Sequence, residues 1–140
     1  ELSLDELEPY LKYIDEVSAR RIRFTILMNE STREAIEIIK RGSKSLNQEL
    51  GEIVNYQHKL LRDLYEVSLP QLEKIRDAML DAGAYGVKIS GAGMGGSLVA
   101  ITPFEEEVKE NIVKAALKAG ASKGWRVRID EGVRLEKITI

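Results

Sequence analysis

The chain has 140 residues, a length that fits a single domain with a buried core of its own. With 21 basic and 23 acidic residues the formal net charge is -2, so no basic surface of the kind that binds nucleic acid is expected. No apolar run approaches the roughly 18 residues of a membrane span, and the first residues are acidic where a secretion signal would be basic. The absence of cysteine excludes disulfides and thiolate metal sites and fits a cytoplasmic location.

Helical patterns dominate the first part of the sequence. Ser3 and Glu6 form a capping-box pattern ahead of apolar residues at helical spacing, and Ser68 and Gln71 repeat that pattern with Pro70 in the first turn. Glycine is typical of the residue just after a helix. Four helices are therefore predicted, over about 3–14, 22–42, 46–64 and 68–83.

In the second part of the sequence the predicted elements are shorter, and most of them are strands. Thr102-Pro103-Phe104-Glu105 combines a cap, a proline and a glutamate, and predicts a fifth helix that ends at Gly120. Four strands are expected, over 85–90, 98–102, 125–129 and 133–138, with a turn at 130–132. The fold class is therefore α+β, a single domain over 1–140. We expect a ferredoxin-like sandwich with a four-stranded antiparallel sheet backed by helices.

The stretch SGAGMGGS, residues 90–97, places four glycines between the first two predicted strands. Gly91, Gly93 and Gly96 satisfy the dinucleotide-binding spacing G-x-G-x-x-G, but a strand-like LVAI follows where that site needs the start of a helix. A Walker loop would need a lysine after glycine, and none is present here. Two interpretations remain: a wide hairpin with strained turns, or a nest of exposed N–H groups that an anion can approach.

The sequence KISGAGMGGSLVAI resembles the third conserved motif of the GHMP small-molecule kinases, whose founders phosphorylate galactose, homoserine, mevalonate and phosphomevalonate. Upstream, NESTREAIEIIKRG and HKLLRDLYEVSLPQLEKI resemble the C-terminal half of galactokinases in order and spacing, and the likeness covers about residues 20 to 102. Ser97 stands where many members have cysteine, and Met94 where galactokinases often have phenylalanine or glycine. These departures leave the subfamily open.

The resemblance implies a C-terminal lobe without the catalytic machinery of the family. The ATP-cradling loop of the form Pro-x-x-x-Gly-Leu-Ser-Ser-Ser-Ala and the catalytic carboxylate lie in an N-terminal domain, and no such segment occurs in these 140 residues. ATP and Mg²⁺ are therefore expected in the complete enzyme, and this chain alone is predicted to be inactive and to bind neither. The expected partners are the N-terminal kinase domain and a sugar substrate, with self-association through the uncovered interdomain face.

No catalytic residue and no metal site are predicted in this chain. The resemblance assigns a loop at the nucleotide and phosphate cleft to seven residues: Gly91, Ala92, Gly93, Met94, Gly95, Gly96 and Ser97. Gly93 and Gly95 are expected to be glycine because a ligand approaches them closely. The resemblance also assigns a contribution to the shape of the cleft to His58, Arg62 and Asp63. The alternatives are a purely structural or surface role for His58 and a helix-end ion pair between Arg62 and Asp63.

Three functions are compatible with the sequence. The leading hypothesis is the C-terminal lobe of a galactokinase-like sugar kinase. The alternatives are a lobe of another GHMP kinase, of the mevalonate type, and a free-standing ferredoxin-like module that binds a metabolite or a partner without catalysis.

Overall fold

The computed structural model describes residues 3–129 and Gly132. The described residues form helices and strands in the order α1 (Leu4–Leu11), α2 (Glu16–Arg41), α3 (Leu46–Asp63), α4 (Pro70–Asp81), β1 (Gly86–Ser90), β2 (Ser97–Ile101) and α5 (Glu106–Ala119). No helix in this described part is both long enough and apolar enough to cross a membrane.

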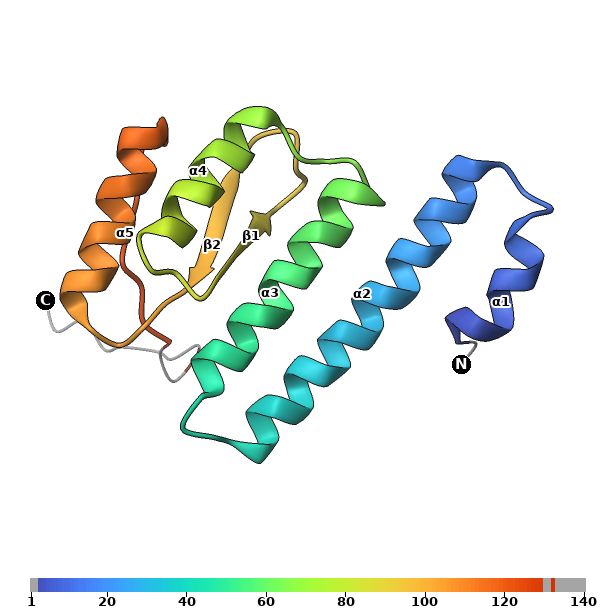
Figure 1. Ribbon diagram of the computed structural model, residues 1–140, viewed down its shortest axis with the longest axis horizontal. Helices are drawn as coiled ribbons and strands as arrows, with labels where there is room; N and C mark the ends of the chain where they lie inside the picture. Colours follow the sequence, from blue (N-terminus) through green and yellow to red (C-terminus); the bar gives the residue numbers. More distant parts are fainter. Residues whose placement is uncertain (1–2, 130–131, 133–140) are drawn as a thin grey trace, which may run out of the picture.

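The elements lie side by side in one broad layer, with a small sheet among the helices (Figure 1). In this view the order runs from α5 through α4, which overlaps the two strands, to α3, α2 and α1. Buried apolar residues of α4 and α5 pack together as one cluster, and a second cluster joins α5 to β1 through Val87, Ala84 and Ile112. The two core clusters thus attach the C-terminal helix pair to the sheet.

The helix boundaries confirm some of the predicted signals. Ser3 and Glu6 form the expected capping box, with the Glu6 carboxylate accepting from the Ser3 backbone N–H at 2.8 Å. Helix α2 begins after Asp15, whose carboxylate accepts from the Ser18 N–H at 2.9 Å, and it ends at Gly42 with φ +63°. These boundaries are set by contacts within three or four residues, which a sequence pattern contains.

Three predicted helix starts are wrong. Helix α2 begins at Glu16, well before the predicted start near residue 22, because Asp15 caps it. Helix α4 begins at Pro70 with Leu69 as its N-cap, because the Ser68 hydroxyl donates to the Glu73 carboxylate and the Gln71 amide donates to the Ala119 carbonyl at 3.0 Å. Helix α5 begins at Glu106 and not at Thr102. At α4 the predicted capping side chain, Ser68, thus binds another group, and at α5 the Thr102 carbonyl accepts from the Asn47 amide at 3.0 Å.

Helix α3 and strand β1 approach so closely that their backbones touch. A Cβ added to Gly86 would lie 2.0 Å from the carbonyl oxygen of Gly51, and one added to Gly51 would lie 2.5 Å from the Tyr85 Cβ. Only glycine allows such an approach at both positions. The Gly51–Gly86 contact therefore fixes the distance between the helix and the strand.

The edge of β1 that faces α3 is satisfied by side chains instead of a third strand. The Asn55 amide donates to the Tyr85 carbonyl at 2.9 Å and its oxygen accepts from the Val87 N–H at 3.1 Å. Arg76 of α4 donates to the Val87 carbonyl at 3.1 Å and to the Asn55 side-chain oxygen at 2.9 Å. Since an uncovered strand edge presents unpaired backbone groups, these two side chains close the sheet on that side.

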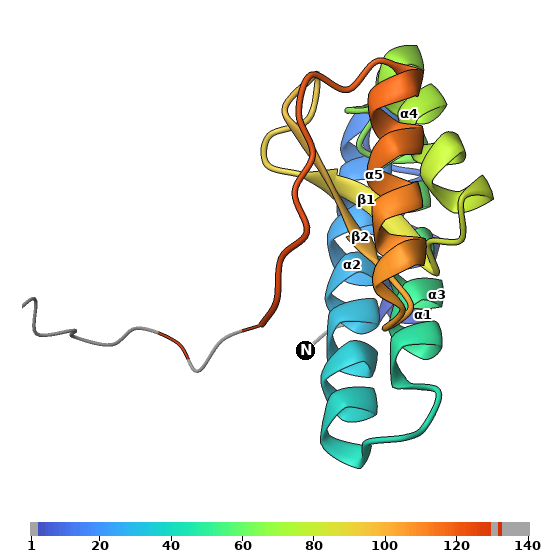
Figure 2. The ribbon, with the colours of Figure 1, turned by 90° about the vertical axis from the view of Figure 1, so that its left-hand side faces the viewer.

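The expected four-stranded sheet is not present in the described residues, where β1 and β2 form a two-stranded antiparallel sheet with Gly86 opposite Ile101 and Ser90 opposite Ser97. The predicted strand at 125–129 pairs with no strand among the described residues and leaves the body of the domain as an extended segment (Figure 2). Its alternating apolar side chains, Trp125 and Val127, are 73% and 82% exposed. Alternation alone does not make a strand, because a strand also needs a neighbour to pair with. The predicted strand at 133–138 and most of the 130–132 turn lie outside the described residues.

Candidate functional site

The glycine-rich loop joins β1 to β2 in a tight, strained backbone path. Its positive φ angles lie at Gly91 (+97°), Gly93 (+75°), Met94 (+57°), Gly95 (+132°) and Gly96 (+91°). Side chains with a Cβ rarely adopt such angles, and Met94 is one of two non-glycine residues that do so in the described chain. The glycines are thus required by the path of the backbone.

The loop rests on the connection between α3 and α4, which spans 64–69. The Met94 N–H donates to the Val67 carbonyl at 2.8 Å. A Cβ on Gly93 would lie 2.5 Å from the Val67 Cβ and 2.9 Å from its carbonyl oxygen. The expectation that Gly93 is glycine because a ligand approaches it is therefore corrected: a contact within the chain itself requires it.

The opposite side of the loop is open. Nothing lies within 4 Å of the Cβ that alanine would add at Gly91 or Gly95, and the Met94 side chain is 66% exposed. Apart from Met94, no residue of 91–96 donates a backbone hydrogen bond to another described residue. Ser97 belongs to β2, where its hydroxyl donates to the Ser90 carbonyl at 3.2 Å. Apart from that of Met94, the N–H groups of this loop thus have no backbone acceptor among the described residues, as in loops that bind anions.

His58, Arg62 and Asp63 lie together at the C-terminal end of α3, and two of them meet at one carboxylate. The His58 Nε2 lies 2.8 Å from Glu73 Oε1, and the Arg62 Nη1 lies 3.5 Å from Glu73 Oε2. Asp63 pairs with Arg62 at 2.7 Å on the surface. His58 is buried, with 1% of its surface exposed, and Arg62 and Asp63 form an ion pair, as the structural alternatives expect. A contribution of the three residues to the shape of the cleft stays a prediction.

Burial and hydrogen bonding shift the protonation of the His58–Glu73 pair. Burial lowers the pKa of the His58 imidazole and outweighs the opposing effect of its bond to Glu73. Burial acts to raise the pKa of the Glu73 carboxyl, but the hydrogen bonds from Ser68 and His58 outweigh it and hold that pKa below its ordinary value. The pair at neutral pH is therefore a neutral imidazole that donates from Nε2 to a carboxylate.

Sequence reasoning missed Ser68, Glu73 and Val67 as parts of this region. Ser68 was expected to cap α4, and Glu73 is one of many glutamates in first helical turns. Val67 contributes through its backbone carbonyl, which has no sequence signature. The available signal was the position of all three inside HKLLRDLYEVSLPQLEKI, the segment that carries the family resemblance.

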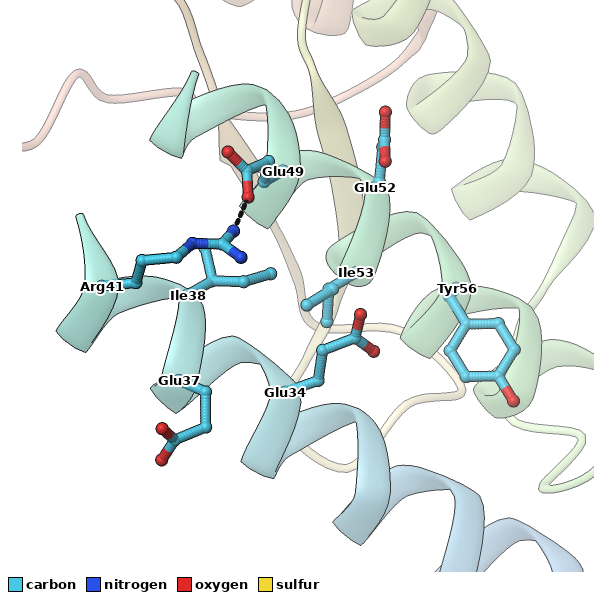
Figure 3. A pocket seen from close by; sticks show the side chains of 8 residues that line it. All are labelled: Glu34, Glu37, Ile38, Arg41, Glu49, Glu52, Ile53 and Tyr56. Atoms are coloured by element: carbon cyan, nitrogen blue, oxygen red, sulfur yellow. Dashed lines mark hydrogen bonds and ion pairs between the residues drawn. The ribbon is translucent and has the colours of Figure 1, made fainter. Parts of the chain in front are cut away.

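A groove of about 580 Å³ lies between α2 and α3, at the opposite end of α3 from the glycine loop (Figure 3). Its rim carries the carboxylates of Glu34, Glu37, Glu49 and Glu52, and Arg41 pairs with Glu49 across it. Among the described residues no group of three or more histidine or acidic side chains has the geometry to hold a metal ion. The groove thus has no feature beyond its acidic rim that defines a ligand.

The sequence model of the family described as GHMP kinases C terminal matches residues 33–123, and the chain belongs to this family. The match contains α3, α4, both strands, the glycine-rich loop and α5.

Among solved structures, the chain is similar to the crystal structure of Lactococcus lactis galactokinase complexed with galactose, with 28% sequence identity and a TM-score of 0.73. The alignment covers 84% of this chain and 30% of the galactokinase chain. The chain thus spans less than a third of the length of that protein.

Proposed function

We propose that this chain is the C-terminal lobe of an ATP-dependent sugar kinase of the galactokinase type. The observation that carries the proposal is the likeness to a galactokinase over 84% of this chain, at an identity of 28%. The family match over 33–123 supports the kinase class, and the galactokinase likeness supports a sugar as the phosphoryl acceptor. A cytoplasmic location, where ATP is abundant, accords with the absence of cysteine.

The proposal requires a second domain, because this chain corresponds to 30% of the galactokinase chain. In the complete enzyme, ATP would supply the transferred phosphoryl group and Mg²⁺ would neutralise its charge. The family resemblance implies that the metal and the catalytic carboxylate belong to the N-terminal domain, and we assign them there. That domain is the proposed partner of this chain.

The open side of the glycine-rich loop suits a phosphate group. The N–H groups of 91–93, 95 and 96 have no backbone acceptor among the described residues, and the space next to Gly91 and Gly95 is unfilled. Backbone donors in a fixed, strained arrangement stabilise negative charge without having to reorganise. We therefore assign the loop to the wall of the phosphoryl-transfer cleft, where it would bind and orient the phosphates.

The acceptor and the need for two domains are tested together. The complete enzyme is assayed with ATP and Mg²⁺ and with galactose, homoserine or mevalonate as acceptor, beside the 140-residue chain alone. We expect phosphorylation of galactose by the complete enzyme and no ATP turnover by the chain above a contaminant control. Preference for mevalonate would replace the sugar by the mevalonate-type alternative. No turnover with any acceptor would favour the non-catalytic binding module.

The loop itself is tested by Gly95→Ala in the complete enzyme, with Gly42→Ala as the matched control. Both glycines have positive φ and open space around the added methyl, but Gly42 lies at the end of α2, far from the loop. Gly95→Ala is expected to lower turnover at least tenfold, or about 1.4 kcal/mol of transition-state stabilisation. Gly42→Ala should leave turnover unchanged. Equal losses in the two variants would show that backbone strain alone acts, and the loop would then be only a turn.

A further inference from the structure

The carboxylate of Glu73 joins three segments of the chain. It accepts from His58 Nε2 of α3 at 2.8 Å and from the Ser68 hydroxyl of the 64–69 connection, and it pairs with Arg62 of α3 at 3.5 Å. Glu73 itself lies in the first turn of α4. Hydrogen bonds to an ionised carboxylate are stronger than neutral ones, so the cluster holds α3, α4 and the connection between them in one arrangement.

The cluster leaves one buried polar atom without a hydrogen bond, which is energetically unfavourable. His58 has 1% of its surface exposed, and its Nδ1 is buried without a hydrogen-bond partner in the described structure. An apolar residue of similar size would fill this space without leaving a polar atom unpaired. The histidine contributes one thing that such a residue lacks, which is the Nε2–H that donates to Glu73.

Val67 is fixed from both sides along the chain. Its neighbour Ser68 is bound to Glu73, and its other neighbour Glu66 pairs with Arg20 at 2.8 Å and Arg21 at 3.3 Å, both from α2. The Val67 N–H also donates to the Leu61 carbonyl at 3.1 Å. The orientation of the Val67 carbonyl is therefore set by groups on three helices.

The glycine-rich loop takes its position from Val67. The Met94 N–H donates to the Val67 carbonyl at 2.8 Å, and Gly93 lies against the Val67 side chain so closely that a Cβ would lie 2.5 Å from it. The 64–69 connection and the glycine-rich loop lie at the same end of the domain (Figure 1). A change in Val67 would therefore shift the loop directly.

We infer that His58, Ser68 and Glu73 are positioning residues that fix the conformation of the glycine-rich loop through Val67. The inference rests on the proposed function, because the position of the loop affects the reaction only if the loop lines the phosphoryl-transfer cleft. These three residues do not touch the reacting groups. They act through one backbone carbonyl and the loop that it holds.

The first test measures the loop directly, in this chain, as the hydrogen-exchange rate of the Met94 amide by NMR. Glu73→Gln and the milder Ser68→Ala are compared with Glu49→Gln. Glu49 is a matched control because it also accepts from serine hydroxyls, Ser43 at 2.6 Å and Ser45 at 2.7 Å, and pairs with an arginine, at the other end of α3.

Loss of hydrogen bonds to an ionised group should speed exchange of the Met94 amide at least about tenfold in both test variants, with no change in Glu49→Gln. His58→Gln, which keeps a donor near the Nε2 position, should retain protection, and His58→Phe should lose it. Unchanged Met94 exchange in folded Ser68→Ala and Glu73→Gln would overturn the inference.

The second test uses the complete kinase with MgATP and galactose. Ser68→Ala is expected to lower kcat/KM for MgATP at least about tenfold, with the KM for galactose and the Tm close to those of Glu49→Gln. If Ser68→Ala frees the Met94 amide but leaves the kinetics unchanged while Gly95→Ala is impaired, the positioning role is overturned and the proposed function stands. If Gly95→Ala is also unimpaired, the loop assignment under the proposed function is the one that fails.

Discussion

Gly93→Ala is the substitution whose effect on stability the structure defines most sharply. Gly93 has φ +75°, and its missing Cβ would lie 2.5 Å from the Val67 Cβ, 2.9 Å from its Cγ2 and 2.9 Å from its carbonyl oxygen. Two of these three atoms belong to the backbone or lie next to it, so a rotation of the Val67 side chain does not remove the conflict. The loop or the 64–69 connection must move.

Two terms contribute to the expected loss of folding free energy. The left-handed backbone conformation costs a residue with a Cβ about 1–2 kcal/mol. Forcing a methyl group into occupied space costs about 1–3 kcal/mol more. The loop can avoid this steric conflict by moving away from Val67, so the steric cost cannot exceed the cost of that movement. The movement loses the Met94–Val67 hydrogen bond, worth about 0.5–1.5 kcal/mol, and the contacts around it.

Gly91→Ala and Gly95→Ala are the reference variants, since both glycines have positive φ and nothing within 4 Å of the added methyl. Urea denaturation of the three variants gives the comparison, and Gly93→Ala should be about 1–3 kcal/mol less stable than the mean of the references. Equal stability of the three variants, within the error of the extrapolation, would refute the contact between Gly93 and Val67.

Three further predictions follow from the structure. Asn55→Ala removes the partner of the Tyr85 carbonyl and the Val87 N–H, and should lower the free energy of unfolding by about 2–4 kcal/mol in urea denaturation, against a negligible change for the exposed Asn29→Ala. The folded-state pKa of His58, which is faced by Glu73, Arg62 and Arg76, lies below the ordinary value of 6.5, so the unfolded chain binds the proton more readily and stability should fall as the pH drops below 6.5. Chemical denaturation between pH 7 and pH 5 should show this loss of stability in the parent chain and not in His58→Gln. An identical pH dependence of the two chains would assign the loss to other groups. Glu73 contributes its own loss of stability only below pH 4.5. Finally, the exposed Trp125 and Val127 are expected to promote self-association of the isolated chain. Sedimentation should show an apparent mass that rises with protein concentration, and Val127→Ser should weaken this rise. A monomer at all concentrations would contradict the prediction.

The sequence alone determined the features that depend on contacts a few residues apart. The capping box of Ser3 and Glu6, the end of α2 at Gly42 and the two strands on either side of the glycines all follow from local spacing, to within a residue for the strands. The family was also readable, because KISGAGMGGSLVAI is one continuous segment. Local hydrogen bonds and backbone angles leave their mark in neighbouring residue types.

Only the tertiary structure decided which partners the side chains of these elements bind and which side chains are buried. Ser68 has the sequence pattern of a helix cap, yet its hydroxyl binds Glu73, the same carboxylate that His58 and Arg62 of α3 contact. Trp125 and Val127 alternate as in a strand, yet they are exposed because 125–129 runs away from the sheet. Which of several possible partners a side chain binds is decided by packing between distant segments, and a single sequence does not record that outcome.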